Sequence, residues 1–131
     1  MGHIYCDIWV KGKKRKMKLE KVLVNTGATY TVLPEDVIKK IGAFGPLNEI
    51  KVELGNSRRI KPKTYAISVK INGSESPAIC ITFKDAKPVI GIETLESLGM
   101  RLNPEKESFE FTRPSGVAYF YNIPKYFFRR Q

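Results

Sequence analysis

The sequence predicts a mostly β protein with one or two short helices. Runs of alternating apolar and polar residues recur along the chain and are separated by turn-forming residues. The sharpest turn signal is Asn72-Gly73, which favours a two-residue hairpin turn between residues 65–71 and 78–83. Helical spacing of apolar residues is confined to two short segments, near residues 34–42 and 92–99. We therefore expect sheet to form most of the structure.

A single domain is expected from the size of the chain, because 131 residues suffice for one core and are too few for two good ones. Hydrophobic residues make up 42% and charged residues 27%, as in ordinary globular proteins, and no apolar run is long enough to cross a bilayer. Residues 1–7 have neither the basic start nor the long apolar centre of a signal peptide. These observations predict one cytoplasmic domain that spans residues 1–131.

The expected elements follow one another with short connections. The first hairpin turns at residues 12–15 and the second near Gly55-Asn56, while Pro62 indicates that one side of the second is an edge. A proline and two acidic residues start the first helix, and glycines end both helices. The expected strands are 3–10, 17–24, 50–54, 58–69 (with the clearest alternation at 65–71), 78–83, 88–91, 101–104 and 108–112, and the expected helices are 34–42 and 92–98.

An excess of basic residues, 23 Lys and Arg against 13 Asp and Glu, gives the chain a formal charge of +10. Such a charge suits nucleic acid, an anionic membrane or acidic peptides, and charge alone does not choose among them. We interpret the densest basic cluster as a solvated hairpin turn, because no aromatic side chains that could stack on bases are interleaved with it. Neither nucleic acid nor a membrane is therefore the expected partner. The cluster consists of Lys11, Lys13, Lys14, Arg15, Lys16 and Lys18.

No metal or other cofactor is expected. The two cysteines, Cys6 and Cys80, both lie among β-forming residues, which in a reducing compartment predicts buried free thiols and no disulfide. With a single histidine, His3, and no paired-cysteine motif, the sequence offers no credible zinc site.

The segment from residue 22 to residue 34 is the one that the rest of the chain surrounds. An apolar run stops at a small polar turn, Asn25-Thr26-Gly27, and a second run of apolar residues and threonines follows directly. This pattern predicts a tight loop between two buried strands, where Gly27 can adopt backbone angles that other residues avoid. Polar side chains at the end of a rigid strand are well placed for chemistry. Since Asn and Gly are also ordinary turn formers, the local pattern alone leaves both interpretations open.

Four features in order make residues 2–112 resemble the retroviral-type (retropepsin-like) aspartic proteases, including their prokaryotic relatives. The loop 25–28, Asn-Thr-Gly-Ala, is similar to the Asp-Thr-Gly-Ala signature of the family, and an apolar stretch at Val32-Leu33 follows it. The hairpin at Gly55-Asn56 has the place of the flap. The other two features are Ile71-Asn72-Gly73, and Val89-Ile90-Gly91 with the helix after it, which is similar to the motif that packs behind the active loop.

The resemblance implies a small closed β-barrel that is half of an enzyme. Members of this length form homodimers, and each subunit supplies one loop to a shared cleft that takes peptides or unfolded proteins. Thr26 matches a threonine that braces the two loops across the dimer axis, and Gly27 matches a glycine whose backbone contacts substrate. The implied catalytic positions are Asn25, Thr26 and Gly27, and the implied substrate-binding residues are Ala28, Thr29, Tyr30, Gly55, Asn56, Ser57 and Ile90.

The main departure from the family is Asn25, which stands where the catalytic aspartate belongs. A carboxamide has nearly the shape of a carboxylate but cannot exchange a proton, so we expect the chain as written not to cleave peptides. Either an aspartic endopeptidase was inactivated by an Asp-to-Asn change, or the chain is a natural pseudo-protease that only binds peptide. Retention of Thr26, Gly27 and Ala28 favours the first. A basic nucleic-acid-binding β-barrel is a third, less favoured alternative.

The tail, residues 113–131, has no counterpart in the short retroviral enzymes. It holds six Tyr and Phe side chains, and so apolar a segment needs something to cover it. The alternatives are that it packs on its own barrel or that it contacts the second subunit. Membrane adhesion comes third, because Arg129 and Arg130 flank only a few aromatic residues.

Overall fold

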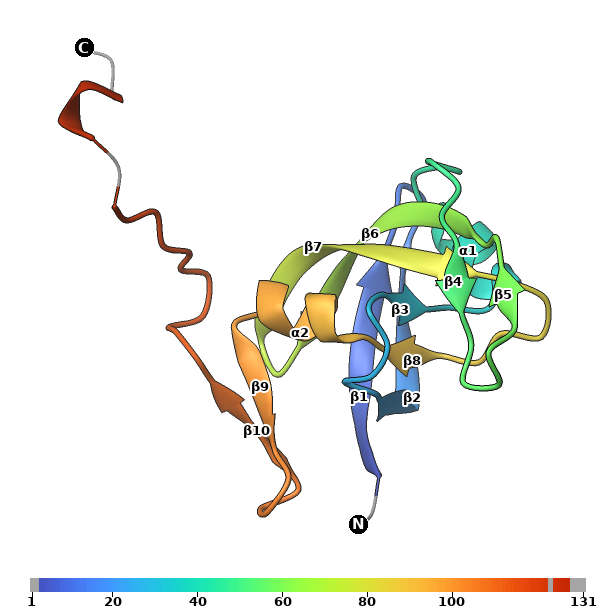
Figure 1. Ribbon diagram of the computed structural model, residues 1–131, viewed down its shortest axis with the longest axis horizontal. Helices are drawn as coiled ribbons and strands as arrows, with labels where there is room; N and C mark the ends of the chain where they lie inside the picture. The colour runs from blue at the N-terminus through green and yellow to red at the C-terminus, as the bar shows by residue number, and fades with distance from the viewer. Residues whose placement is uncertain (1–2, 123, 128–131) are drawn as a thin grey trace.

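Six strands close into a small β-barrel, as expected (Figure 1). The structure is a computed structural model that describes residues 3–122 and 124–127. Around the barrel the strands follow the order β1-β2-β8-β3-β7-β6. These strands are β1 (Ile4–Lys11), β2 (Lys16–Val24), β3 (Thr31–Val32), β6 (Lys63–Ile71), β7 (Ser74–Thr82) and β8 (Val89–Ile90).

The core lies inside this barrel. Successive side chains of a strand point to opposite faces. The alternating pattern therefore places the apolar residues of each strand in the interior and the residues between them on the outside. Each large apolar side chain that is fully buried contributes about 1.5–3 kcal/mol. The core residues from the long strands include Ile8, Val10, Val22, Val24, Ile67, Val69, Ile71 and Cys80.

Both short helices form where helical spacing predicted them. Helix α1 (Glu35–Ile41) begins directly after Pro34 and ends at Gly42, whose φ of 69° is in the left-handed region that favours glycine. Helix α2 (Ile92–Ser97) follows Gly91 and buries Thr94 and Leu95. Among the described residues, no helix has both the length and the apolar character needed to cross a bilayer.

Two small two-stranded sheets extend from the barrel. One is the hairpin of β4 (Val52–Glu53) and β5 (Arg59–Ile60), and the other pairs β9 (Met100–Asn103) with β10 (Ser108–Phe111). All three expected turns, at 12–15, near Gly55-Asn56 and at Asn72-Gly73, join antiparallel partners.

Two expected strand boundaries were wrong. The strand expected over 58–69 is broken at Lys61-Pro62, because proline has no N–H to donate to a ladder. Strand β7 begins at Ser74, four residues before the expected start at 78, and it includes Pro77. The reason is the turn: Asn72 and Gly73 both have positive φ, at 49° and 81°, so Ile71 pairs directly with Ser74.

The tail does not cover its own barrel in the part that the structure describes. Arg113 attaches the start of the tail to the end of α2, since the guanidinium donates to the carbonyl oxygens of Glu96 and Ser97 at 3.1 and 2.7 Å. Beyond it the chain runs away from the barrel (Figure 1), and the side chains of Tyr119, Phe120, Tyr121 and Tyr126 are exposed, that of Tyr126 to 88%. Arg129 and Arg130, invoked for membrane adhesion, lie outside the described residues.

The thiol of Cys80 should make stability depend on alkaline pH. Burial raises the pKa of Cys80 from 9.0 to about 12, and burial, together with the charge of Asp7, raises that of Cys6 to about 11. The folded protein therefore holds the thiol of Cys80 neutral. The contribution of this neutral thiol to the free energy of unfolding is fully present below the ordinary pKa of 9.0. It decreases by roughly 1 kcal/mol for each pH unit above that value.

Urea unfolding near pH 8 and near pH 10 measures this effect. The unmodified chain should lose more free energy of unfolding between the two pH values than Cys80→Ala, which serves as the control for all other titrating groups. Equal losses in the two proteins would contradict the prediction.

Candidate active site

The loop that carries Asn25 starts where β2 runs parallel to β8. Leu23 and Val24 pair with Val89 and Ile90, and the N–H of Asn25 donates to the carbonyl oxygen of Ile90 at 3.0 Å. The chain then turns tightly. The N–H of Ala28 donates to the Asn25 carbonyl at 3.0 Å, and the N–H of Gly27 donates to Asn25 Oδ1 at 2.9 Å. The side chain of Asn25 is thus held by its own loop, as in other turns of this kind.

The start of α2 holds the second half of the loop. The N–H groups of Ile92 and Glu93 donate to the carbonyl oxygens of Ala28 and Thr29, at 2.8 and 3.1 Å. Gly91 packs directly against the backbone, since a Cβ there would lie 2.5 Å from the carbonyl carbon and oxygen of Tyr30. Only glycine allows this approach.

Two buried threonines brace the loop from behind. The hydroxyls of Thr31 on β3 and Thr94 on α2 share a hydrogen bond of 2.7 Å, although the residues are 63 positions apart in the sequence. The N–H of Gly91 also donates to Thr31 Oγ1, at 3.2 Å. Both hydroxyls are almost completely buried, so each needs a hydrogen-bond partner. Together the two hydrogen bonds connect β3, α2 and the residue after β8 around the loop.

A cleft of about 580 Å³ opens in front of the loop. The loop forms one side, the β4 arm of the hairpin forms another, and apolar side chains from β3 and the end of β7 complete it. The lining residues are Asn25, Gly27, Ala28, Thr29, Tyr30, Val32, Ile50, Lys51, Val52, Glu53, Leu54, Gly55, Ile81 and Phe83.

The structure brings together only part of the predicted site. Asn25, the loop from Gly27 to Tyr30, and Gly55 all line this cleft. Thr26, Asn56 and Ser57 are exposed and do not line it. Asn56 instead shapes the hairpin turn, because its Oδ1 accepts the N–H of Arg58 at 3.0 Å.

Ile90 is the clearest correction among the predicted site residues. Its side chain is 0% exposed and belongs to the core cluster, so it does not contact the cleft. Its contribution is the carbonyl oxygen that accepts the N–H of Asn25. Ile90 therefore supports the loop, and the predicted contact with substrate is wrong for the single chain.

Sequence reasoning missed the apolar lining of the cleft. Alternation over 50–54 indicated a strand, but nothing in it indicated that the whole arm, with Lys51 and Glu53, faces the cleft. Phe83 and Ile81 join the lining because β7 lies next to β3 in the barrel, where Val32 pairs with Ile81. The Thr31–Thr94 bond had no sequence signal, since it depends on two segments that meet only in the fold.

The cleft of one chain contains few acidic side chains. Its lining contains one carboxylate, Glu53, whose Oε1 lies 3.7 Å from Arg59 Nε on the exposed hairpin. Asn25 cannot take up or release a proton. In the part of the chain that the structure describes, no group of three or more His, Cys, Asp or Glu residues could hold a metal ion. The single-chain cleft therefore presents one carboxylate, at Glu53, and an amide at position 25.

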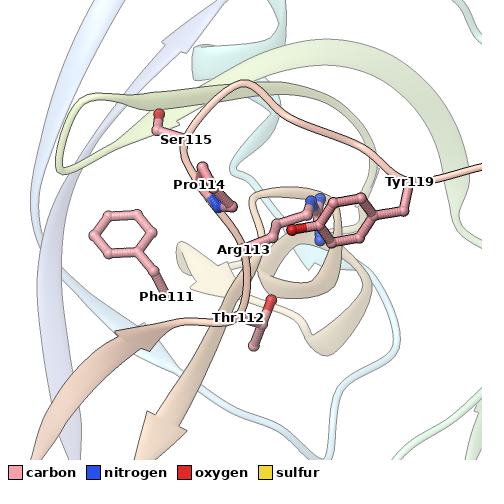
Figure 2. A pocket seen from close by; sticks show the side chains of 6 residues that line it. All are labelled: Phe111, Thr112, Arg113, Pro114, Ser115 and Tyr119. Atoms are coloured by element: carbon pink, nitrogen blue, oxygen red, sulfur yellow. The ribbon is translucent and has the colours of Figure 1, made fainter.

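A second hollow, of about 430 Å³, lies where the tail leaves β10 (Figure 2). It is formed by residues 111–115 and Tyr119, and most of them are exposed. The guanidinium of Arg113 is already used by the carbonyl oxygens at the end of α2. This hollow offers no reactive side chain, so the cleft beside Asn25 is the better candidate site.

No model of a known protein family matches this chain, and a search of curated proteins found no match either.

Gly91→Ala should destabilise the protein by about 1–3 kcal/mol, because the added methyl group overlaps the backbone of Tyr30. Gly55→Ala is the matched control: a Cβ at Gly55 meets nothing within 4 Å, so its effect should stay within about 0.5 kcal/mol. Urea denaturation measures both. If the two variants were equally stable, the close packing of Gly91 on the loop would be refuted.

Proposed function

We propose that this chain is one subunit of a homodimeric aspartic endopeptidase of the retropepsin-like kind, in a form that binds peptides without cleaving them. The observation that carries the proposal is the turn at Asn25, which is fixed by Ile90 and Gly91 and faces a cleft of about 580 Å³. A catalytic side chain at this position would be held by backbone contacts on both sides of the loop.

The lining of the cleft favours an extended peptide as ligand. Val32, Ile81 and Phe83 offer apolar contacts on one side, and the arm 50–55 offers Ile50, Val52 and Leu54 on the other. Such a surface suits the side chains of an unfolded segment. A strand-like peptide could also hydrogen-bond to the backbone of the hairpin, as in other cases of strand addition.

Hydrolysis in the active parent would need two carboxylates. Two acids close together cannot both ionise, so they share a proton: one form activates a bound water and the other donates to the peptide carbonyl. Each loop supplies one such position, which is why we propose a homodimer. Thr26 supports this, because its exposed hydroxyl has no hydrogen-bond partner within residues 3–122 and 124–127 and is free to bond across a dimer axis.

The local geometry suits aspartate as well as asparagine at position 25. The atom that accepts the N–H of Gly27 is Oδ1, and a carboxylate oxygen in the same place could accept the same bond. An Asp-to-Asn change would therefore abolish proton transfer and leave the loop intact. The second candidate is a natural peptide-binding pseudo-protease, which the intact cleft favours equally; the codon for residue 25 in the source gene decides between the two.

Asn25→Asp should create peptidase activity. We expect the variant to cleave an unfolded protein in the acidic range, at least about a hundredfold faster than the unmodified chain, because general acid–base catalysis is restored. A statine-type mimic of the transition state should block the activity. Asn56→Asp is the matched control: it adds the same charge at the exposed end of the hairpin, outside the cleft, and should remain inactive.

Absence of cleavage by a folded Asn25→Asp variant over the whole acidic range would refute the proposed enzyme class. Sedimentation of the unmodified chain tests the dimer separately. A strictly monomeric mass at micromolar concentration would remove the shared cleft on which the mechanism depends.

A further inference from the structure

A second surface of the barrel combines basic and aromatic side chains. We call it the basic–aromatic surface and define it by Trp9, Lys11, Lys13, Lys16, Phe44 and Lys70. It shares no residue with the lining of the cleft beside Asn25.

The fold brings aromatic rings to the basic hairpin turn, which the local sequence did not suggest. Trp9 on β1 is 41% exposed and Phe44, after α1, is 57% exposed. Lys16 Nζ lies 5.2 Å from the centre of the Trp9 ring, and Lys13 Nζ lies 4.9 Å from that of Phe44. Each ring therefore has a cation beside it. No aromatic residue is interleaved with the basic cluster in the sequence, but the fold places two rings beside it.

Two adjoining hollows connect the rings. The first, of about 310 Å³, is lined by Trp9, Lys11, Lys16, Ser68, Lys70 and Glu75. The second, of about 340 Å³, contains Phe44 and shares Lys11, Ser68 and Glu75 with the first. Strand register explains the arrangement, because Trp9 pairs with Lys70 and Lys11 pairs with Ser68 on the neighbouring strand. A ligand could thus extend from one ring to the other along the outer face of the sheet.

The surface is held rigidly by the backbone. The N–H groups of Lys13 and Lys14 donate to the carbonyl oxygens of Gly42 and Ile41, at 2.8 and 2.9 Å. A Cβ at Gly12 would lie 2.4 Å from the Ile41 carbonyl oxygen, so the turn packs directly on the end of α1. Phe44 is bridged to Ala66 by two backbone hydrogen bonds. A ligand would have little backbone order to induce on binding.

The charges of this surface are mostly uncompensated. Among the described residues, no salt bridge engages Lys11, Lys13, Lys16 or Lys70. Lys18, on the same hairpin, does have a partner, Asp7, at 3.9 Å. Glu75 is the one carboxylate that lines the two hollows. The surface therefore favours a polyanion.

Rings and cations together favour single-stranded nucleic acid over other polyanions. Phosphates bind lysines, and unpaired bases stack on exposed aromatic rings with little dependence on sequence. An acidic peptide would bind the lysines but make no stacking contact with the rings. In a duplex the bases are paired and stacked on one another, so they cannot stack on Trp9 or Phe44. We propose that the basic–aromatic surface binds single-stranded nucleic acid, with phosphates at Lys11, Lys16 and Lys70 and bases against Trp9 and Phe44.

Trp9 makes a direct test possible, because it is the only tryptophan of the chain. Titration with an oligomer of about twelve thymidines at low salt should quench its fluorescence, as stacking requires. The triple variant Lys11→Gln/Lys16→Gln/Lys70→Gln should bind a dye-labelled oligomer about tenfold or more weakly and reduce the slope of log affinity against log salt by about two. The matched control, Lys84→Gln/Lys87→Gln/Lys106→Gln, has the same net charge and should bind like the unmodified chain.

Phe44→Ser tests the stacking component at an exposed position, and we expect it to weaken binding by about fivefold or more without affecting the fold measured by circular dichroism. Absence of binding at low salt would overturn the proposal. So would equal losses in the two triple variants, since net charge alone would then explain the affinity. Polyglutamate or anionic vesicles that bind as tightly, with no effect of Phe44→Ser, would assign the surface to another partner. None of these outcomes depends on peptidase activity.

Discussion

The close packing of Gly91 on the backbone of Tyr30 is the contact on which the site depends. It lets α2 begin directly behind the loop, where its first N–H groups can bond to the carbonyl oxygens of Ala28 and Thr29. It also places Thr94 within 2.7 Å of Thr31, so that a buried polar pair closes the arrangement. A side chain at position 91 would separate these elements. The loop is therefore specified by long-range packing and only secondarily by its own turn residues.

The contacts that hold residue 25 in place are separate from the terminal group that would transfer a proton. An Asp-to-Asn change at this position would therefore leave the cleft intact. The groups that fix residue 25 are backbone N–H and carbonyl groups of Gly27, Ala28 and Ile90, which do not depend on whether the side chain ends in an amide or an acid. The stability of the fold therefore depends little on whether residue 25 ends in an amide or an acid. Catalysis does depend on it, because only the carboxyl form can exchange a proton.

The sequence predicted those parts of the fold in which a local rule and the tertiary structure agree. The Asn72-Gly73 turn, the glycine after α1 and the alternation of β1 and β6 are of this kind, and all three are confirmed. The predictions failed where a residue's role depends on a distant segment. Ile90 was expected in the cleft but faces the core, and Phe44 meets Lys13, 31 residues earlier in the chain, only in the folded structure. The cleft lining on 50–54 was missed for the same reason, because a strand pattern does not say what the strand faces.

Closure of the barrel allows one strand to serve two separate surfaces. Near its end β7 contributes Ile81 to the cleft beside Asn25, and nearer its start it contributes Glu75 and Pro77 to the hollows of the basic–aromatic surface. Between them, Ala78 and Cys80 are buried in the core, and Ile79, which is 38% exposed, lines neither the cleft nor the two hollows. Exposed substitutions on one surface should therefore leave the other unaffected, because sites that share no partners act additively. The proposed binding of peptides and the proposed binding of nucleic acid would in this sense be physically independent.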